Sequence, residues 1–303
     1  MLRQNRGMLP ENWTILTLLK WTTAYFKSHH VEQPRATAEI LLAHTLGVGR
    51  VDLYVQYERL LEEEELGRFK GYIRRRTQRE PVAYIVGKKE FWSMDFEVAP
   101  GVLIPRPETE TLVEAVLMAV PEEPTAASLR ILDLGTGSGA VIVAVASERP
   151  GHEFYAVDRS QEVLAAAHNN ARAHGLDKTI TFLQGDWFDP VRELGSRFDV
   201  IVSNPPYIST PELEGLPPEI SRHEPREALD GGPDGLDPIR LIVREASDYL
   251  APGGWLLFEI GHDQWDRVEK LIFSAKAYRD IDVVKDYGGR DRVARARRIG
   301  DSR

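Results

Sequence analysis

The 303-residue sequence contains no cysteine. That absence excludes disulfide bonds, thiolate zinc sites, iron–sulfur clusters and a cysteine nucleophile. Long apolar runs are also missing, since the longest, residues 140–146, is far shorter than the ~20 residues that cross a bilayer. The first residues, MLRQNRGMLPENW, lack the apolar core of a signal peptide. We therefore expect a soluble, cytoplasmic protein with no membrane association.

An excess of positive charge is missing as well. The chain has 38 Lys and Arg against 47 Asp and Glu, a formal net charge of −9. Residues 1–80 carry 13 basic and 10 acidic side chains, whereas the remainder carries 25 and 37. An acidic chain is poorly suited to binding the phosphate backbone of nucleic acid, so we expect no direct binding of nucleic acid. The eight histidines show no ligand spacing, and we expect no metal site.

The first 80 residues have the pattern of a small helical bundle. Apolar residues recur at helical spacing after Thr14, which can cap a first helix. Pro34 and Gly47 are typical of the start and the end of a second helix. Residues 62–76 are acidic at the start and basic at the end, which complements a helix dipole. We predict a helical domain over residues 1–80.

Residues 81–103 predict a connector. Val82, Tyr84 and Val86 stand at alternate positions, Gly87 can turn the chain, and residues 91–98 alternate again. Such alternation indicates strands, so we predict a β-hairpin linker.

Residues 104–303 alternate between short apolar strands and helices. The predicted strands are 129–134, 154–157, 180–183, 200–202 and 255–260, and the predicted helices include 140–147, 161–174 and 238–250. This alternation predicts an α/β domain with a parallel sheet and helices on both faces. The basic stretch 290–298 is interleaved with apolar residues, which favours an edge strand with outward arginines over a nucleic-acid patch.

A glycine-rich turn, DLGTGSG, occupies residues 133–139 between a predicted strand and a predicted helix. Glycines let the backbone approach a ligand, and a helix start offers unpaired N–H groups. The spacing G-x-G-x-G differs from the dinucleotide pattern G-x-G-x-x-G. Asp133 precedes the glycines, and its charge suits a cofactor with a cationic end better than a pyrophosphate. A purely structural turn is the alternative.

Acidic residues follow the next two strands. Asp158 can accept hydrogen bonds from a ribose diol, although it can also cap the following helix. Asp186 and Trp187 together offer a polar group and an aromatic face, as adenine requires, although Trp187 can equally be a core residue. Ligands of open parallel sheets bind at these strand ends, so we predict a site for a nucleoside-containing cofactor.

The segment Asn204-Pro205-Pro206-Tyr207 directly follows another predicted strand. Consecutive prolines fix the backbone, so the Asn204 side-chain oxygen and a backbone carbonyl can form two fixed acceptors. Two adjacent acceptors match the two hydrogens of a planar –NH2 group, and Tyr207 offers a face for stacking. We predict N-methylation of an amide or an exocyclic amine, with no nucleophile from the protein. A rigid proline-rich loop is the alternative.

Motifs across nearly the whole chain resemble one family, the peptide chain release factor glutamine methyltransferases (PrmC/HemK), which are class I S-adenosylmethionine-dependent enzymes. Besides the glycine turn, Asp158 and the Asn-Pro-Pro-Tyr segment, the motifs are residues 80–87 (EPVAYIVG), 90–92 (EFW), 104–110 (IPRPETE), 224–229 (EPREAL), 231–236 (GGPDGL) and 287–293 (YGGRDRV).

The resemblance implies a Rossmann-like, seven-stranded, mostly parallel sheet, joined by a β-hairpin to a helical domain that helps to dock the protein substrate. It implies methyl transfer from S-adenosyl-L-methionine to the N5 amide of the glutamine in a Gly-Gly-Gln motif of release factors. The implied cofactor-binding residues are Asp133, Leu134, Gly135, Thr136, Gly137, Asp158, Asp186, Trp187 and Asn204. Asn204, Pro205, Pro206 and Tyr207 would hold the substrate glutamine, with Asn204, Pro205 and Tyr207 acting in catalysis.

Three alternatives stay open at this point. An exocyclic amine of a DNA or RNA base is also a planar –NH2 group, although a base in a duplex must be extruded first. A glutamine of a ribosomal protein would require the same pocket. A cofactor-binding module without activity is the third. The role of the predicted loop at residues 224–236, close to the pocket, is also open.

Overall fold

The computed structural model describes residues 13–122, 128–195 and 197–300. They form two compact units that divide between Gly87 and Lys88. Each unit has a hydrophobic core of its own.

The first unit is helical, as predicted. Its helices are α1 (Ile15–Ser28), α2 (Pro34–Leu46), α3 (Asp52–Val55), α4 (Glu63–Thr77) and α5 (Val82–Val86). Thr14 caps α1 through its side chain, and Gly47 ends α2 in the left-handed conformation that glycine tolerates. Phe26, Leu41 and Phe69 are fully buried where the helices pack together.

The predicted strand at residues 82–86 is wrong, because this segment is helix α5. Val82, Ile85 and Val86 contact the helical core, and this i, i+3, i+4 spacing is a helical face that the alternation of apolar residues had concealed. Gly87, in the left-handed region, ends the helix.

The hairpin exists, and it consists of β1 (Lys88–Phe91) and β2 (Met94–Glu97). Trp92 and Ser93 form its turn, both with positive φ, as the tightest hairpin turns require. The backbone N–H of Trp92 donates to the Glu110 carboxylate at 2.9 Å. Phe91 and Phe96 are buried in the core of the second unit, so the hairpin belongs structurally to that unit.

The second unit contains the predicted seven-stranded sheet. Its strands are β3 (Arg130–Leu134), β4 (Glu153–Asp158), β5 (Ile180–Gln184), β6 (Phe198–Ser203), β7 (Leu250–Glu259), β8 (Tyr278–Lys285) and β9 (Asp291–Arg298). Their order is β5-β4-β3-β6-β7-β9-β8, and β3 to β7 pair in parallel. The strand order reverses at β3, which is where open sheets of this kind bind their ligands.

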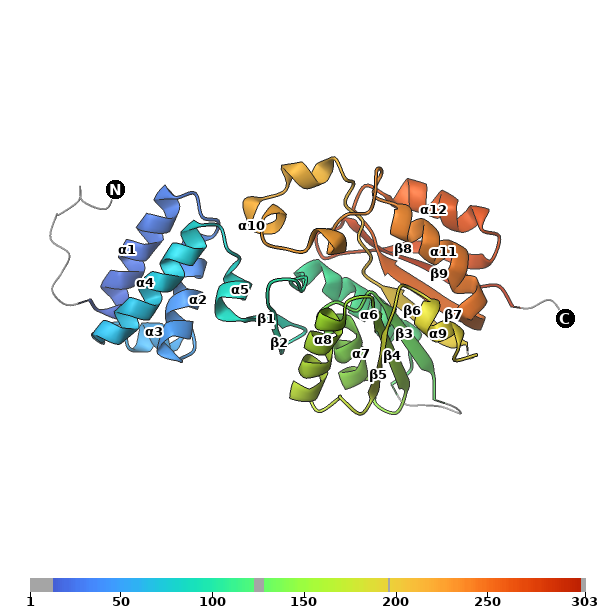
Figure 1. The fold of residues 1–303 in the computed structure, drawn as a ribbon, viewed down its shortest axis with the longest axis horizontal. Coiled ribbons are helices and arrows are strands. Elements are labelled where there is room, and N and C mark those ends of the chain that lie inside the picture. Colours follow the sequence, from blue (N-terminus) through green and yellow to red (C-terminus); the bar gives the residue numbers. More distant parts are fainter. Residues whose placement is uncertain (1–12, 123–127, 196, 301–303) are drawn as a thin grey trace. The chain divides into compact units, whose positions relative to one another are not determined.

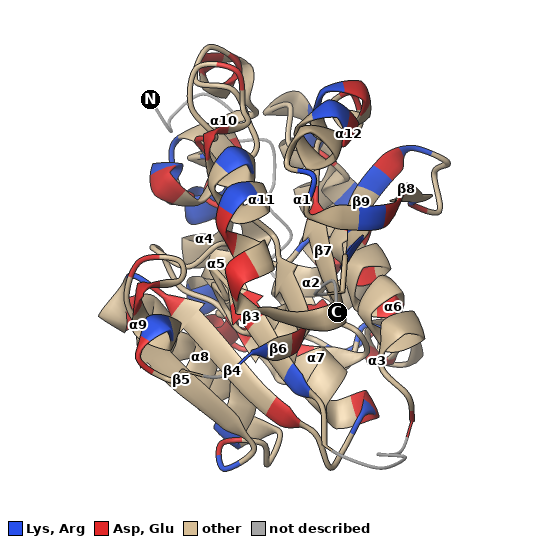
Figure 2. Ribbon diagram, turned by 90° about the vertical axis from the view of Figure 1, so that its right-hand side faces the viewer, with Lys and Arg blue, Asp and Glu red and all other residues tan. Residues whose placement is uncertain are grey.

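The basic strand β9 is not at an edge, contrary to the prediction. It pairs antiparallel with β7 on one side and with β8 on the other. Val293, Ala294 and Ala296 are fully buried, which favours a central position. Figure 2 shows basic and acidic residues together on the ribbons of β8 and β9, and Arg295 pairs with Asp282 at 2.9 Å.

Helices cover both faces of the sheet (Figure 1). On one face lie α6 (Glu110–Ala119), α7 (Ala140–Glu148) and α8 (Gln161–Ala173), and on the other α9 (Asp189–Arg192), α11 (Asp237–Tyr249) and α12 (Trp265–Ser274). Short helices lie in the connections: η1 (Pro107–Thr109), η2 (Glu212–Gly215), α10 (Pro218–Ser221) and η3 (Arg226–Ala228). In the described part of the chain, no helix has the length and apolar character that a bilayer requires.

Candidate functional site

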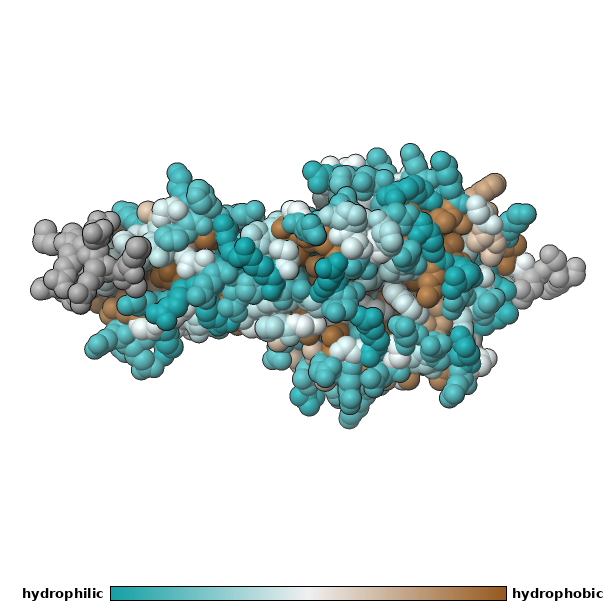
Figure 3. Space-filling model, turned by 45° about the horizontal axis from the view of Figure 1, so that its top comes forward, coloured by the Kyte–Doolittle hydropathy of each residue, from teal (hydrophilic) through white to brown (hydrophobic). Residues whose placement is uncertain are grey.

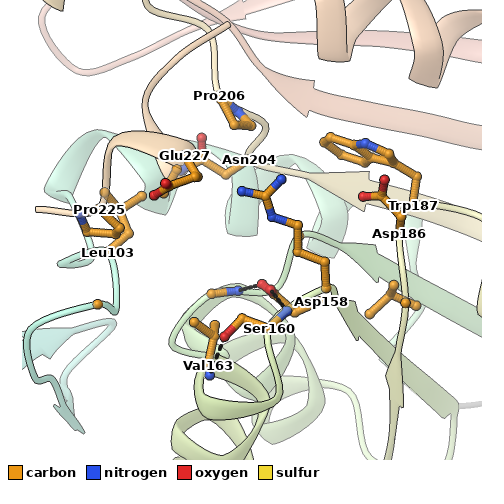
Figure 4. A pocket seen from close by; sticks show the side chains of 17 residues that line it. Leu103, Asp158, Ser160, Val163, Asp186, Trp187, Asn204, Pro206, Pro225 and Glu227 are labelled. Atoms are coloured by element: carbon orange, nitrogen blue, oxygen red, sulfur yellow. Dashed lines mark hydrogen bonds between the residues drawn. The ribbon is translucent and has the colours of Figure 1, made fainter.

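A cavity of about 420 Å³ opens at the carboxyl ends of strands β3 to β6. Such a volume is typical of a pocket for a small-molecule ligand. Seven of the residues predicted from the sequence line it: Gly135, Gly137, Asp158, Asp186, Trp187, Asn204 and Pro206. Figure 4 shows Asp158, Asp186 and Trp187 opposite Asn204 and Pro206, so the cofactor and amide motifs share one space.

Asp158 connects the glycine turn to the start of α8. Its two carboxylate oxygens accept hydrogen bonds from the backbone N–H groups of Gly137 and Ser160, both at 3.1 Å. Burial raises the pKa of this carboxyl, and these bonds oppose the rise. An ionised carboxylate has about four acceptor positions, so Asp158 retains capacity for a diol.

Asp133, Leu134 and Thr136 belong to the glycine-rich turn, but they are buried or turned away from the cavity and are not among its lining residues. Only 1% of Asp133 is exposed, and its carboxylate accepts a hydrogen bond from the Thr136 hydroxyl at 2.7 Å. Burial, together with the nearby charge of Asp158, raises the pKa of Asp133 to about 7. Asp133 therefore supports the turn from below, through Thr136.

Asp186 and Trp187 line the cavity beyond the end of β5. Trp187 has a φ of 46°, a left-handed conformation that is rare for a bulky residue and is concentrated at functional sites. Gly185 precedes them, and a Cβ at that position would lie 2.4 Å from the ring of Pro190. The glycine therefore lets the chain turn closely past the start of α9.

The Asn-Pro-Pro-Tyr segment continues directly from β6. Asn204 and Pro206 line the cavity, whereas Pro205 is buried. The Asn204 side-chain Nδ2 donates to the Thr109 hydroxyl at 3.3 Å. Because the nitrogen is engaged there, the side-chain oxygen is the atom available to accept a hydrogen bond within the cavity.

Tyr207 does not line the cavity. Its hydroxyl donates to Glu259 Oε1 at 2.8 Å, and burial together with the carboxylate raises its pKa well above the usual value. Its carbonyl accepts a hydrogen bond from Gln264 Nε2 at 2.8 Å, and the same nitrogen donates to Gly235. Stacking of a substrate on Tyr207 stays a prediction, because these contacts fix the residue behind the cavity wall.

The loop at residues 224–236 does reach the cavity, through Pro225, Glu227 and Ala228. Glu224 is buried, pairs with the Arg106 guanidinium and accepts a hydrogen bond from the backbone N–H of Ile104 at 3.3 Å. This contact joins two of the motifs that the sequence resemblance rested on.

Sequence reasoning missed several residues of the cavity wall and one residue behind it. The missed wall residues are Gly101, Leu103, Val157, Arg159, Ser160, Val163 and Gly185. Val157, Arg159 and Gly185 directly adjoin predicted site residues, so adjacency could have indicated them. Thr109 lies within the motif at residues 104–110, but its contact with Asn204, 95 positions later, had no local signal.

Comparison with known proteins agrees with this geometry. Residues 17–87 match the PrmC N-terminal domain, and residues 126–273 match a methyltransferase domain. The release factor glutamine methyltransferase of Geobacter sulfurreducens is 44% identical over 95% of this chain and 98% of its own length. That of Moorella thermoacetica is 46% identical over 86% of this chain and 90% of its own.

A solved methyltransferase from Pyrococcus furiosus has the same fold. It covers 70% of this chain and 92% of its own, with a TM-score of 0.51 and 18% sequence identity. The curated relatives are the stronger basis for assigning a family, because they are similar to this chain over most of its length. The chain belongs to the release factor glutamine methyltransferase family.

Proposed function

We propose that this protein transfers the methyl group of S-adenosyl-L-methionine to the N5 side-chain amide of the glutamine in the Gly-Gly-Gln motif of peptide chain release factors. The observation that carries the proposal is the single cavity shared by Asp158, Trp187, Asn204 and Pro206. A donor site for the cofactor and an acceptor site for an –NH2 group must adjoin for direct transfer. Curated relatives with this name support the choice of substrate.

The residues present fit the cofactor. Asp158 would accept hydrogen bonds from the ribose hydroxyls, and Asp186 with Trp187 would hold the adenine by its edge and its face. Gly135 and Gly137 bring the backbone to the cavity wall, where a Cβ would otherwise stand. Bound there, the cofactor supplies an electrophilic methyl group on a positively charged sulfur.

The Asn-Pro-Pro-Tyr segment would promote methyl transfer by orienting the glutamine side-chain amide. Asn204 Oδ1 and the carbonyl of Pro205 would each accept one hydrogen of the glutamine –NH2 group. An amide nitrogen is a weak nucleophile, and holding both of its hydrogens directs the remaining lone-pair density at the methyl group. Asn204 would also stabilise positive charge that develops on the nitrogen during transfer. No protein nucleophile is needed, which agrees with a chain that has no cysteine.

We assign the docking of the protein substrate to the helical unit, residues 1–80 in the sequence-based division. Its slight excess of basic side chains contrasts with the acidic remainder of the chain. We expect no direct contact with nucleic acid, because the acidic catalytic unit would repel phosphates. The face of the molecule drawn in Figure 3 is largely hydrophilic, with apolar side chains exposed in separate groups.

Methyl transfer from labelled cofactor tests the substrate. Purified release factor, ribosomal proteins, DNA and RNA are each incubated with the enzyme, and mass spectrometry locates the added methyl group. We expect one methyl group on the glutamine of the Gly-Gly-Gln peptide of the release factor. Label only in a ribosomal protein would identify the alternative glutamine substrate, and label only in nucleic acid would overturn the proposal.

A further inference from the structure

Glu259 is a buried carboxyl directly behind the amide site. It ends β7, one residue beyond the point where Phe258 pairs with Ser203 of β6, and 1% of it is exposed. Tyr207 donates to its Oε1. Within the described residues, Oε2 has no partner of full hydrogen-bond geometry, although the Thr109 hydroxyl lies close enough for hydrogen bonding to lower the pKa of the carboxyl. Thr109 is thus placed to be its second donor.

Opposing effects act on the pKa of Glu259. Burial, the largest of them, and the charge of Glu108 raise it, the hydroxyl groups of Thr109 and Tyr207 and the charge of Arg292 lower it, and the net direction is upward. Arg292 is itself buried, where it pairs with Asp286 at 3.2 Å and donates to the carbonyl of Ile260 at 3.3 Å. Because Asn204 Nδ2 donates to the Thr109 hydroxyl at 3.3 Å, the hydrogen of that hydroxyl is left to donate, and Glu259 Oε2 can accept it.

An acceptor at this position determines the direction of the next hydrogen bond. A hydroxyl has one hydrogen and two lone pairs, so a Thr109 that donates to Glu259 presents lone pairs to Asn204. Asn204 must then turn its Nδ2 toward Thr109, as the structure shows at 3.3 Å. The Oδ1 atom is then the one left to accept a hydrogen bond from an –NH2 substrate in the cavity that Asn204 lines. A reversed amide would place its oxygen against the lone pairs of Thr109 and its –NH2 group against the –NH2 donors of the substrate.

We propose that Thr109 and Glu259 are positioning residues that fix the orientation of the Asn204 amide, and so make the site selective for a substrate that donates hydrogen bonds. The identity of that substrate rests on the proposed function. The direction of the hydrogen bonds does not, and it can be measured in the free protein.

The first experiment tests for the hydrogen bond between Asn204 Nδ2 and the Thr109 hydroxyl in the absence of substrate. The sequence has five asparagines, Asn5, Asn12, Asn169, Asn170 and Asn204, so labelling with 15N-asparagine gives few side-chain NH2 signals. The Asn204 signal is assigned by its loss in Asn204→Asp, and the exposed Asn169 serves as the reference for exchange with water. We expect the Asn204 NH2 to exchange about ten-fold more slowly than the reference in the wild type and in Thr109→Ser. It should lose this protection in Thr109→Val, and equal protection in Thr109→Val and the wild type overturns the proposal.

The second experiment measures how the substitutions change catalysis. It is carried out at a temperature at which circular dichroism shows every variant to be folded. We expect kcat/KM for the release factor to fall about ten-fold in Thr109→Val and in Glu259→Gln, and to stay within about three-fold in Thr109→Ser. Cofactor affinity by calorimetry should be unchanged. Equal kcat/KM in Thr109→Ser and Thr109→Val would mean that Thr109 only fills space, and the inference fails.

The two experiments separate the two proposals. If the wild type does not methylate a release factor while the NMR difference between Thr109→Ser and Thr109→Val persists, the proposed function fails and the positioning role stands. If the wild type is active and both differences are absent, the positioning role is wrong and the proposed function stands.

Discussion

At the scale of single residues, the site separates into groups that would touch a ligand and groups that hold them. Asn204 and Asp158 line the cavity, whereas Asp133 and Tyr207 lie behind it with their polar atoms engaged. Substitutions in the two groups should therefore have different effects on binding, turnover and stability.

Asn204→Ala should lose most turnover, because it removes one of the two acceptors for the amide hydrogens. Cofactor affinity should stay within a few-fold, since the cofactor contacts assigned to Asp158 and Trp187 are untouched. Calorimetry and single-turnover methylation measure the two effects. Asn169→Ala, at an exposed position on α8, is the matched control and should be unchanged in both. Unchanged turnover in Asn204→Ala would show that the role of the amide is misassigned.

Asp133 should make stability depend on pH. Its pKa is raised to about 7 in the folded protein from its ordinary value of 3.8, so the folded state binds more protons than the unfolded state between these values. The contribution of Asp133 to the free energy of unfolding therefore decreases as the pH rises from 4 to 7 and is level above that.

Asp133→Asn removes this titration. The difference in melting temperature, variant minus wild type, should rise between pH 5 and pH 7 and level off above pH 7. Thermal unfolding followed by circular dichroism at several pH values measures it. Thr109→Ser, which leaves the ionisable groups unchanged, is the control, and a difference that is flat across the range contradicts the assignment.

At the scale of elements, the carboxyl ends of the strands and the loop at residues 224–236 form the site together. Gly235 has a φ of +76°, and a Cβ there would lie 2.5 Å from the carbonyl oxygen of Tyr207. This close approach lets Gln264 bind both carbonyls with one nitrogen. The loop and the Asn-Pro-Pro-Tyr segment are thus packed backbone against backbone.

Gly235→Ala should displace the Asn-Pro-Pro-Tyr segment. We expect a loss of about 1–3 kcal/mol in the free energy of unfolding, from strain and steric overlap, and a fall in kcat/KM. Urea unfolding and steady-state kinetics measure these effects. Gly215→Ala is the control, because a Cβ at Gly215 meets nothing within 4 Å. If Gly235→Ala behaves like Gly215→Ala, the two segments are not coupled.

Local signals explain which elements were predictable. Glycine turns, strand-end acids and apolar runs are short-range patterns, so β3 to β6 and α7 were predicted close to their bounds. The five residues of α5 were too few to separate a helical face from alternation. The position of β9 depends on its pairing with both β7 and β8, which periodicity does not encode. The contact of Thr109 with Asn204 likewise depends on tertiary structure.

At the scale of the whole molecule, the chain has two units with separate cores, and we assign different tasks to them. Among the residues that the structure describes, those that line the cavity all belong to the second unit. A fragment that begins at Lys88 therefore contains every wall residue of the cavity.

We expect this fragment to bind the cofactor with an affinity within a few-fold of the full chain. Its KM for the release factor should rise at least about ten-fold, because the docking contacts assigned to the helical unit are absent. A short Gly-Gly-Gln peptide, which is too small to reach that unit, is the control substrate and should be methylated equally by both proteins. Equal KM values for the intact release factor would remove the docking role from the helical unit.

The position of Glu259 also has a consequence for the order in which the site is completed during synthesis. The glycine turn, Asp158, Trp187 and Asn204 all emerge from the ribosome before β7, whose last residue is Glu259. A nascent chain that ends before β7 therefore carries every motif of the cavity but lacks the carboxylate that contacts Tyr207. The site can be finished only when β7 has paired with β6, so the enzyme becomes competent for orienting an amide late in its own translation.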